Sequence, residues 1–194
     1  MVYADLLRPT MRRSALLYDA ALVLGASLVI ALSAQVAIQL PFSPVPITGQ
    51  TMAVLLVGAL LGSRRGALAV LAYIAEGLAG LPVFAGGAAG LARLFGPTGG
   101  YLVGFVAAAF LVGWLAERGW DRRFGTTLAA MTLGNLVIYA VGVVWLAVFV
   151  GGLSRAWSLG VLPFLPGDVI KIILAAVLLP GGWKLLGMRG RTGH

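Results

Sequence analysis

The sequence predicts an all-α integral membrane protein with six transmembrane helices. Of its 194 residues, 60% are hydrophobic and only 10% are charged, whereas about a quarter of a typical soluble domain is charged. Residues 20–63, 94–116 and 124–154 contain no charged side chain and no histidine. Each run exceeds the ~20 residues that a helix needs to cross a bilayer, and the first is long enough for two crossings. No segment shows the alternation of apolar and polar residues expected of a membrane β-barrel.

Turn-forming segments divide these runs into the expected helices. Three prolines in residues 41–46 (PFSPVP) end the first helix, because proline removes a backbone donor and blocks helical continuation. The second helix, over 50–61, is only ~18 Å long at 1.5 Å per residue, so the proline segment must itself reach membrane depth. Such backbone is tolerated there only inside protein or beside a cavity. We expect one membrane domain over residues 1–194, with helices over residues 19–40, 50–61, 66–81, 101–116, 127–150 and 163–186.

The basic residues predict the orientation of the helices. The N-terminal lead-in, two interhelical turns and the C-terminal tail hold eleven of the fourteen Lys and Arg residues: Arg8, Arg12, Arg13, Arg64, Arg65, Arg118, Arg122, Arg123, Lys184, Arg189 and Arg191. Only Arg93 and Arg155 fall on the other side. Because cytoplasmic loops of membrane proteins are enriched in Lys and Arg, both termini are expected to be cytoplasmic. The basic stretch before residue 20 leads into a first helix rather than a removable signal.

Several other functions are excluded. The net charge of +8 lies at the ends of the apolar runs, which indicates topology rather than nucleic-acid binding. The chain has no cysteine, its single histidine is His194, and it lacks both H-E-x-x-H and the G-x-x-x-x-G-K-[ST] phosphate loop. Disulfides, a zinc protease site and ATP hydrolysis by this chain are therefore not expected. We expect neither enzymatic activity nor a metal or cofactor.

Asp168 and Lys171 are the strongest candidates for a functional site. They lie within the last apolar helix, three residues apart on one helix face. An ionisable side chain costs roughly 2.5–3.5 kcal/mol at the centre of a membrane helix, so such residues usually mark function. The alternative is an ion pair that holds two helices together and touches no ligand.

The remaining polar groups of the helices gather in the same, outer half of the membrane. Their depths, together with the two Pro- and Gly-rich loops that open on that side, predict an outward-facing pocket for a small solute with polar and apolar parts. These residues also have purely structural interpretations. Tyr101 could be an interfacial tyrosine, Gln50 a helix cap and Glu76 a paired carboxyl group, while Asn135 could form an interhelical hydrogen bond. Arg93, on the outer loop, either attracts an anionic solute or is solvated. The pocket candidates are Gln50, Glu76, Tyr101 and Tyr139.

Four stretches resemble the BioY family, the biotin-specific S-components of energy-coupling factor (ECF) transporters in prokaryotes. They are residues 44–51 (PVPITGQT), 80–87 (GLPVFAGG), 95–102 (FGPTGGYL) and 166–171 (PGDVIK). The resemblance spans roughly residues 15–185. It implies an S-component fold in the prokaryotic plasma membrane, with an outward biotin site beneath the helix 1–2 and helix 3–4 loops.

The resemblance also implies residue roles. Asp168 and Lys171 match the binding pair of the family's last helix, where Asp168 can accept from the ureido N–H groups of biotin and Lys171 or Arg93 can neutralise its carboxylate. Phe84 would help enclose the thiophane ring. A membrane T-component and two ABC ATPases would supply energy, and small residues on the first helix would contact the T-component. Such small-xxx-small patterns let helices approach closely; here they are Ala21, Gly25, Ser27 and Ala31.

Alternatives remain at this point. The chain could be a stand-alone biotin facilitator or channel, including a homo-oligomeric one, or an S-component for another small vitamin. The sequence separates neither from an ATP-coupled biotin subunit, because coupling depends on other chains and sibling S-components share the fold.

Overall fold

Four helices of the computed structural model are long and apolar enough to cross a membrane. They are α1 (Arg12–Gln35), α5 (Gly99–Glu117), α6 (Phe124–Val150) and α8 (Leu165–Leu185). Two shorter helices, α2 (Gln50–Leu61) and α3 (Ser63–Leu78), follow α1. The structure describes residues 1–187, so Arg189, Arg191 and His194 lie outside the described residues. The chain is mostly helical, as the sequence predicts.

The predicted first helix differs most from the structure. Instead of covering 19–40, α1 begins at Arg12 and ends at Gln35. It begins earlier because its basic lead-in is itself compatible with a helix, although those residues lie outside the apolar run. It ends earlier because the chain becomes extended: β1 (Ala37–Ile38) pairs antiparallel with β2 (Ile47–Thr48). This short ladder pairs backbone groups of the Pro-rich segment that would otherwise lack partners.

The other predicted helices differ less. The helix predicted over 50–61 coincides with α2, whereas α3 is shifted from 66–81 to Ser63–Leu78. α5, α6 and α8 lie within three residues of the predicted ends. Two segments predicted as loops contain short helices, α4 (Leu91–Leu94) and α7 (Leu153–Gly160), and two 3₁₀ turns also appear, η1 (Tyr3–Asp5) and η2 (Trp120–Arg122).

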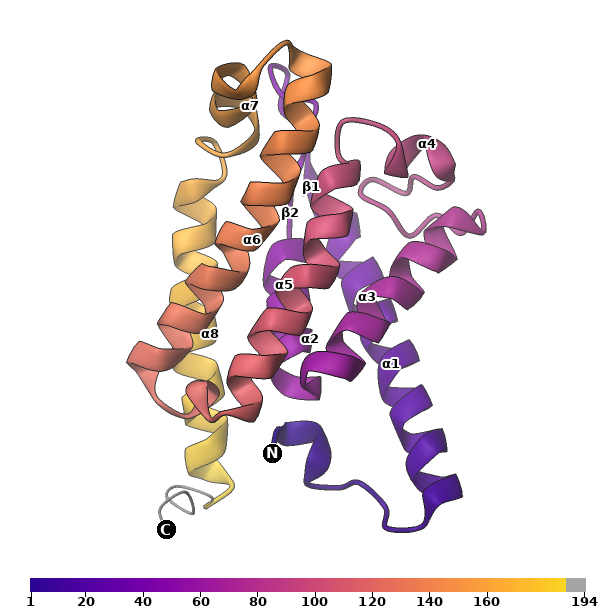
Figure 1. Cartoon of the computed structure of the whole chain (residues 1–194), viewed down its shortest axis with the longest axis vertical. Coiled ribbons are helices and arrows are strands. Elements are labelled where there is room, and N and C mark those ends of the chain that lie inside the picture. Colours follow the sequence, from indigo (N-terminus) through magenta and orange to yellow (C-terminus); the bar gives the residue numbers. More distant parts are fainter. Residues whose placement is uncertain (188–194) are drawn as a thin grey trace.

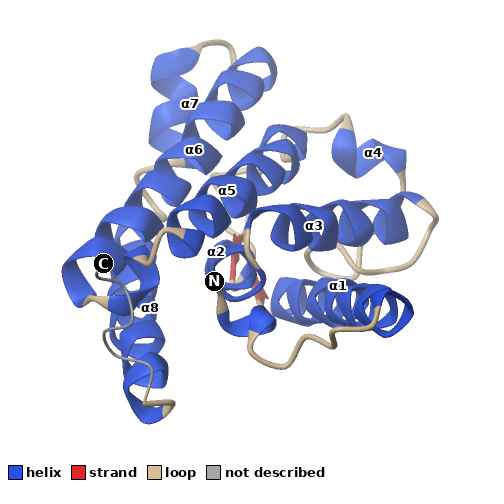
Figure 2. Ribbon diagram, turned by 60° about the horizontal axis from the view of Figure 1, so that its bottom comes forward, coloured by secondary structure: helices blue, strands red, loops and turns tan. Residues whose placement is uncertain are grey.

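The helices form a bundle with distinct ends. The N-terminus and the last turn of α8 lie at the bottom of the bundle, while α4, α7 and the β1–β2 segment lie at or towards the top (Figure 1). In both views α1 lies beside α3, and α6 lies beside α5 (Figures 1 and 2). The crossing of α5 over the α2–α3 turn is very close: a Cβ on Gly113 would lie 2.4 Å from the carbonyl carbon of Gly62. Only glycine fits that crossing.

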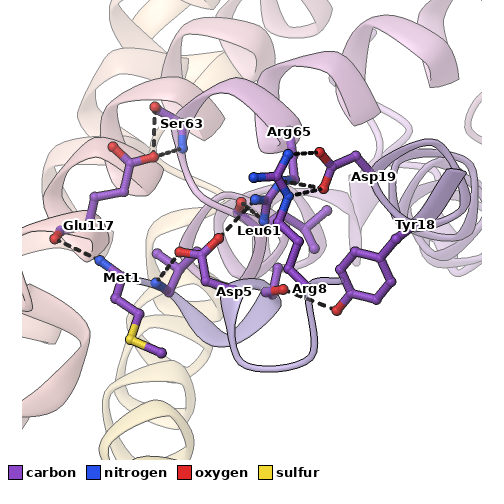
Figure 3. A network of polar contacts seen from close by, with 11 residues as sticks. Met1, Asp5, Arg8, Tyr18, Asp19, Leu61, Ser63, Arg65 and Glu117 are labelled. Atoms are coloured by element: carbon purple, nitrogen blue, oxygen red, sulfur yellow. Dashed lines mark hydrogen bonds and ion pairs between the residues drawn. The ribbon is translucent and has the colours of Figure 1, made fainter. Parts of the chain in front are cut away.

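A network of charged groups closes the end that carries the termini (Figure 3). Arg65, at the start of α3, pairs with Asp5 at 2.8 Å and with Asp19 at 3.0 Å. Arg8 pairs with the same Asp19 at 2.7 Å. Nearby, the Glu117 carboxylate accepts hydrogen bonds from the backbone N–H and the hydroxyl of Ser63. These contacts fasten the N-terminal segment, residues 1–11, to α1, α3 and α5.

The same segment reaches the end of α8. The Tyr3 hydroxyl donates to the Leu179 carbonyl, and its ring lies 4.3 Å from that of Trp183. The Trp183 indole N–H in turn donates to Asp121 at 2.6 Å. Burial raises the pKa of the Asp121 carboxyl above its usual value, and burial raises the pKa of Tyr3 to about 12. The lower end of α8 is thus anchored by aromatic packing and hydrogen bonds.

Candidate functional site

A cavity opens at the end of the bundle opposite the termini. The space between its lining atoms, open solvent at the mouth included, amounts to ≈ 680 Å³. Its wall comes from the Pro-rich segment with β2, the starts of α2, α5 and α8, the middle of α3 and α6, the segment after α3, and α4. Seven of the predicted site residues line it: Gln50, Phe84, Arg93, Tyr101, Tyr139, Asp168 and Lys171.

Asp168 is buried and accepts hydrogen bonds from four side chains. Its Oδ1 accepts from Lys171 at 3.1 Å and from the Thr51 hydroxyl at 3.3 Å. Its Oδ2 accepts from the Asn135 amide at 3.0 Å and from the Tyr139 hydroxyl. A carboxylate offers about four lone-pair sites, so every site of Asp168 is occupied without a ligand.

Lys171 is satisfied in the same way. Its ammonium group has three N–H donors, and these reach the Thr48 carbonyl at 2.9 Å, the Thr51 hydroxyl at 2.9 Å and Asp168. The partners lie on β2 and α2, while Asn135 and Tyr139 lie on α6. Asp168 and Lys171 therefore connect the upper part of α8 to β2, α2 and α6. They also form part of the cavity wall.

Other groups on the wall retain hydrogen-bonding capacity. The Arg93 guanidinium group forms no hydrogen bond or ion pair with any residue of the described chain. The Tyr73 hydroxyl accepts from Gln50 Nε2 at 2.6 Å, and its own hydrogen has no acceptor within residues 1–187. Gln50 keeps a second amide N–H. The cavity thus presents a guanidinium group, a hydroxyl donor and an amide donor to a ligand.

Four neutral polar residues of the cavity wall are not among the residues predicted from the sequence. They are Thr48, Thr51, Tyr73 and Thr98. Tyr73 is one polar aromatic residue in an apolar helix, close to Glu76, and the position of Glu76 in the outer half is the signal that could have drawn attention to it. Thr51 belongs to the PVPITGQT stretch and Thr98 to FGPTGGYL, but a threonine carries no charge that would distinguish it from core packing.

Glu76 was predicted to contact the ligand, and the structure places it elsewhere. Its carboxylate faces α1, where its Oε1 accepts from the Ser27 hydroxyl at 2.7 Å, and it does not line the cavity. Residue number indicates how far along α3 Glu76 lies, but not which face of the helix carries it. Asn135, by contrast, makes the interhelical hydrogen bond considered for it, from α6 to α8.

The small residues of α1 divide into two sets. Ala21 and Gly25 are exposed, and a Cβ on Gly25 would meet nothing within 4 Å. Ser27 and Ala31, predicted to contact a partner, are buried instead. They lie in the interface of α1 with the rest of this chain, because α1 turns one small-residue stripe towards α3 and leaves the other open.

Two aromatic residues of the wall have clear packing roles. The Tyr101 hydroxyl donates to the Gly160 carbonyl at 2.9 Å, which ties α5 to the end of α7. Phe84 is 2% exposed and lies edge-on to Tyr73, with ring centroids 5.5 Å apart. Both side chains therefore shape the cavity and are themselves held in place.

Comparisons with known proteins agree on one family. A sequence model of the BioY family matches residues 9–188. The chain is 44% identical over 163 residues to the biotin transporter BioY of Rhizobium etli, covering 80% of this chain and 87% of that protein. It is 43% identical over 141 residues to the biotin transporter BioY of Thermotoga maritima, covering 73% and 82%. A crystal structure of the S-component for biotin from an ECF-type ABC transporter matches with a TM-score of 0.79 and 30% identity, over 90% of this chain and 95% of that one.

Proposed function

The chain belongs to the BioY family, and on this premise we propose that it binds biotin as the S-component of an ECF-type ABC transporter. It resides in a prokaryotic plasma membrane and is a transport subunit rather than an enzyme. The observation that carries the proposal is the cavity: the stretches that resemble the family converge on it from separate parts of the chain, within a fold that matches a biotin S-component over nine-tenths of the chain.

The proposed arrangement in the membrane has six crossings and cytoplasmic termini. α2 and α3 serve as short crossings, each completed by the non-helical segment at its outer end. Two observations support this arrangement. Among residues 1–187, all Lys and Arg residues except Arg93, Arg155 and Lys171 belong to the N-terminal segment, to the α2–α3 and α5–α6 connections or to the helix ends beside them. The cavity opens at the other end of the bundle, towards the biotin supply.

The free groups of the wall suggest how biotin is held. Its valerate carboxylate pairs with Arg93, because all three donors of Lys171 already have partners. Its ureido carbonyl accepts from Tyr73 and Gln50, and its thiophane ring packs among Phe84 and neighbouring apolar residues. Asp168 and Lys171 keep the wall in place, so their substitution weakens binding through α8 as well as through any direct contact.

Transport requires partners that this chain does not contain. It has no phosphate-binding loop, so ATP hydrolysis falls to two ABC ATPases acting through a T-component. The open small-residue stripe of α1, at Ala21 and Gly25, supports a contact with a membrane helix of that T-component. The rest of the bundle's outer surface contacts membrane lipids.

Biotin binding to the purified chain in detergent tests the proposal. Wild-type protein is expected to bind saturably, and Arg93→Gln to bind biotin at least tenfold more weakly, a loss of ~1.4 kcal/mol. Biotin amide, which has no charge on its tail, should lose little affinity in the same variant. Arg155→Gln, which removes the other outer arginine, is the control. Absence of binding by folded wild-type protein would refute the biotin assignment, and equal losses for acid and amide would refute the role of Arg93.

Lys171→Ala and Asp168→Asn complete the test. Because these residues hold α8 to α2 and α6, we expect both variants to lose more than tenfold for biotin and for its amide alike. Loss confined to the acid in Lys171→Ala would instead assign the carboxylate to Lys171.

A further inference from the structure

The segment that follows α3 folds into a hairpin over the cavity; residues 79–90 are called the roof hairpin here. Phe84 N–H donates to the Ala88 carbonyl and Gly87 N–H to the Phe84 carbonyl, both at 3.0 Å. Gly86 and Gly87 have φ of 70° and 73°, a backbone region that glycine adopts at little cost. The hairpin is therefore closed by its own backbone bonds before it contacts a ligand.

Phe84 is the anchor of the roof hairpin. Among residues 79–90, all of which the structure describes, it is the single buried side chain. The other fastenings are weaker or lie at the edges: Gln35 Nε2 donates to the Val83 carbonyl at 3.3 Å, and Gly90 N–H donates to the Gly77 carbonyl at 2.8 Å. Burial of a large apolar ring is the strongest of these contacts, so the ring dominates the attachment.

Gly77 of α3 provides the seat for that ring. A Cβ on Gly77 would lie 2.2 Å from Phe84 Cζ and 2.5 Å from both Cε atoms, so the end of the ring points directly at the helix backbone. A glycine inside a helix is unfavourable relative to alanine, and here its missing side chain gives the ring its space. One turn earlier, Tyr73 contacts the edge of the same ring and presents its hydroxyl to the cavity wall.

We propose that Gly77 is a positioning residue for the ligand site. It receives Phe84 and thereby holds the roof hairpin over the cavity, which sets how long biotin stays bound. This rests on the proposed function for the ligand, but the seating of the hairpin does not depend on it. Phe84, predicted from the family resemblance to enclose the thiophane ring, then acts first as the attachment point of the roof.

A double-mutant cycle tests the seat. In Gly77→Ala the added methyl displaces the ring, so the amides of Phe84, Gly87 and Gly90 should exchange with deuterium at least tenfold faster without ligand. The biotin dissociation rate should rise at least tenfold as well. Phe84→Leu lacks the Cε and Cζ atoms that the methyl would meet, so adding it to Gly77→Ala should restore much of the protection. Gly125→Ala is the control, because a Cβ there meets nothing within 4 Å.

The outcomes separate the two proposals. Unchanged exchange and unchanged dissociation in folded Gly77→Ala would overturn the positioning role, as would additive effects in the double variant. Faster exchange in a protein whose wild type binds no biotin would sustain the seat and refute the proposed ligand. If Gly77→Ala does not fold, Phe84→Ala empties the seat without crowding α3, and it must then raise both rates for the proposal to stand.

Discussion

Four donors on one carboxylate explain how the chain tolerates Asp168 at membrane depth. An isolated charge there is expensive, but Lys171, Thr51, Asn135 and Tyr139 together replace the water that the carboxylate loses. Removing the carboxylate would leave its partners as buried donors without that acceptor, which costs more than the bonds themselves. The pair is thus an assembly point for three elements and a part of the cavity wall.

We predict that Asp168→Asn destabilises the chain even without biotin. The amide group must direct an N–H at one of the existing donors, so the expected loss is about 1–3 kcal/mol, seen as a lower apparent melting temperature in detergent. Thr132→Val, which removes a hydroxyl bonded only to its own helix at Leu128, should change little. Equal melting temperatures for wild type and Asp168→Asn would show that the network contributes nothing to stability.

We predict that replacing Asp121 and replacing Asp5 have opposite effects on the stability of the protein at neutral pH. Burial raises the pKa of the Asp121 carboxyl, so the folded state prefers its protonated form, and the stability it contributes is lost as pH rises through that raised pKa. Asp121→Asn should therefore raise the melting temperature in detergent at pH 7.5. The gain should shrink towards pH 4, near the usual value of ~3.9.

Asp5 is the matched comparison. Burial favours its neutral form, but the bonds from the Val2 N–H and the Arg65 guanidinium outweigh burial and lower its pKa. Its contribution is present above the usual carboxyl pKa and is lost as pH falls through the lowered one. Asp5→Asn should therefore lower the melting temperature at pH 7.5, with the difference shrinking in acid. The same sign for both variants would contradict this account.

At the residue level, the sequence predicted the charged residues that line the cavity, Arg93, Asp168 and Lys171, because ionisable groups stand out in an apolar chain. It missed Tyr73 and Thr51, which are neutral. It misplaced Glu76 because depth along a helix follows from residue number, whereas the face depends on which neighbour packs against it. It also left the carboxylate partner undecided between Arg93 and Lys171, a choice that requires counting the donors already in use.

At the level of secondary-structure elements, the helices of this bundle are held together by a few polar or close contacts near their ends. α8 has much of its surface exposed, and it is held above by the Asp168 network and below by Tyr3 and Asp121. The N-terminal segment serves the same purpose for α1 and α3 through Arg65 (Figure 3). Uncharged apolar runs predicted the long helices, although both ends of α1 differ from the prediction. They did not predict α4, α7 or the two-residue strands, because such short elements arise from tertiary contacts rather than from a repeating pattern.

Substitution of the adjacent residues Arg64 and Arg65 tests whether the ion pairs of the N-terminal segment stabilise the protein. Arg65→Gln leaves Asp5 without its ion pair and removes one of the two pairs of Asp19, and we expect a loss of about 1–3 kcal/mol in detergent. Arg64 is exposed and forms no ion pair within the described residues, so Arg64→Gln should leave the melting temperature unchanged. High salt should narrow the difference only slightly, because Arg65 is mostly buried. Equal losses of melting temperature in Arg65→Gln and Arg64→Gln would show that the loss of a positive charge, and not the loss of the ion pairs, lowers stability.

For the whole molecule, capture and energy supply are separated between chains. The bundle presents a cavity at one end, a closed ionic network at the other, and an open small-residue stripe on the side of α1. The chain has no phosphate-binding loop for ATP, so the direction of transport depends on how this bundle contacts its partner chains. That makes the orientation of the cavity the property on which the transport proposal depends.

Cysteine labelling in intact cells tests that orientation directly, because the natural chain contains no cysteine to cause background. Thr10 is exposed beside the ionic network, and Ser154 is exposed on α7 at the cavity end. A membrane-impermeant maleimide should label Ser154→Cys in intact cells and Thr10→Cys only after lysis. The reverse pattern would place eleven cations outside and turn the cavity towards the cytoplasm, where it could not collect external biotin. Labelling of both before lysis would indicate mixed insertion, and the charge distribution would then not determine topology in this chain.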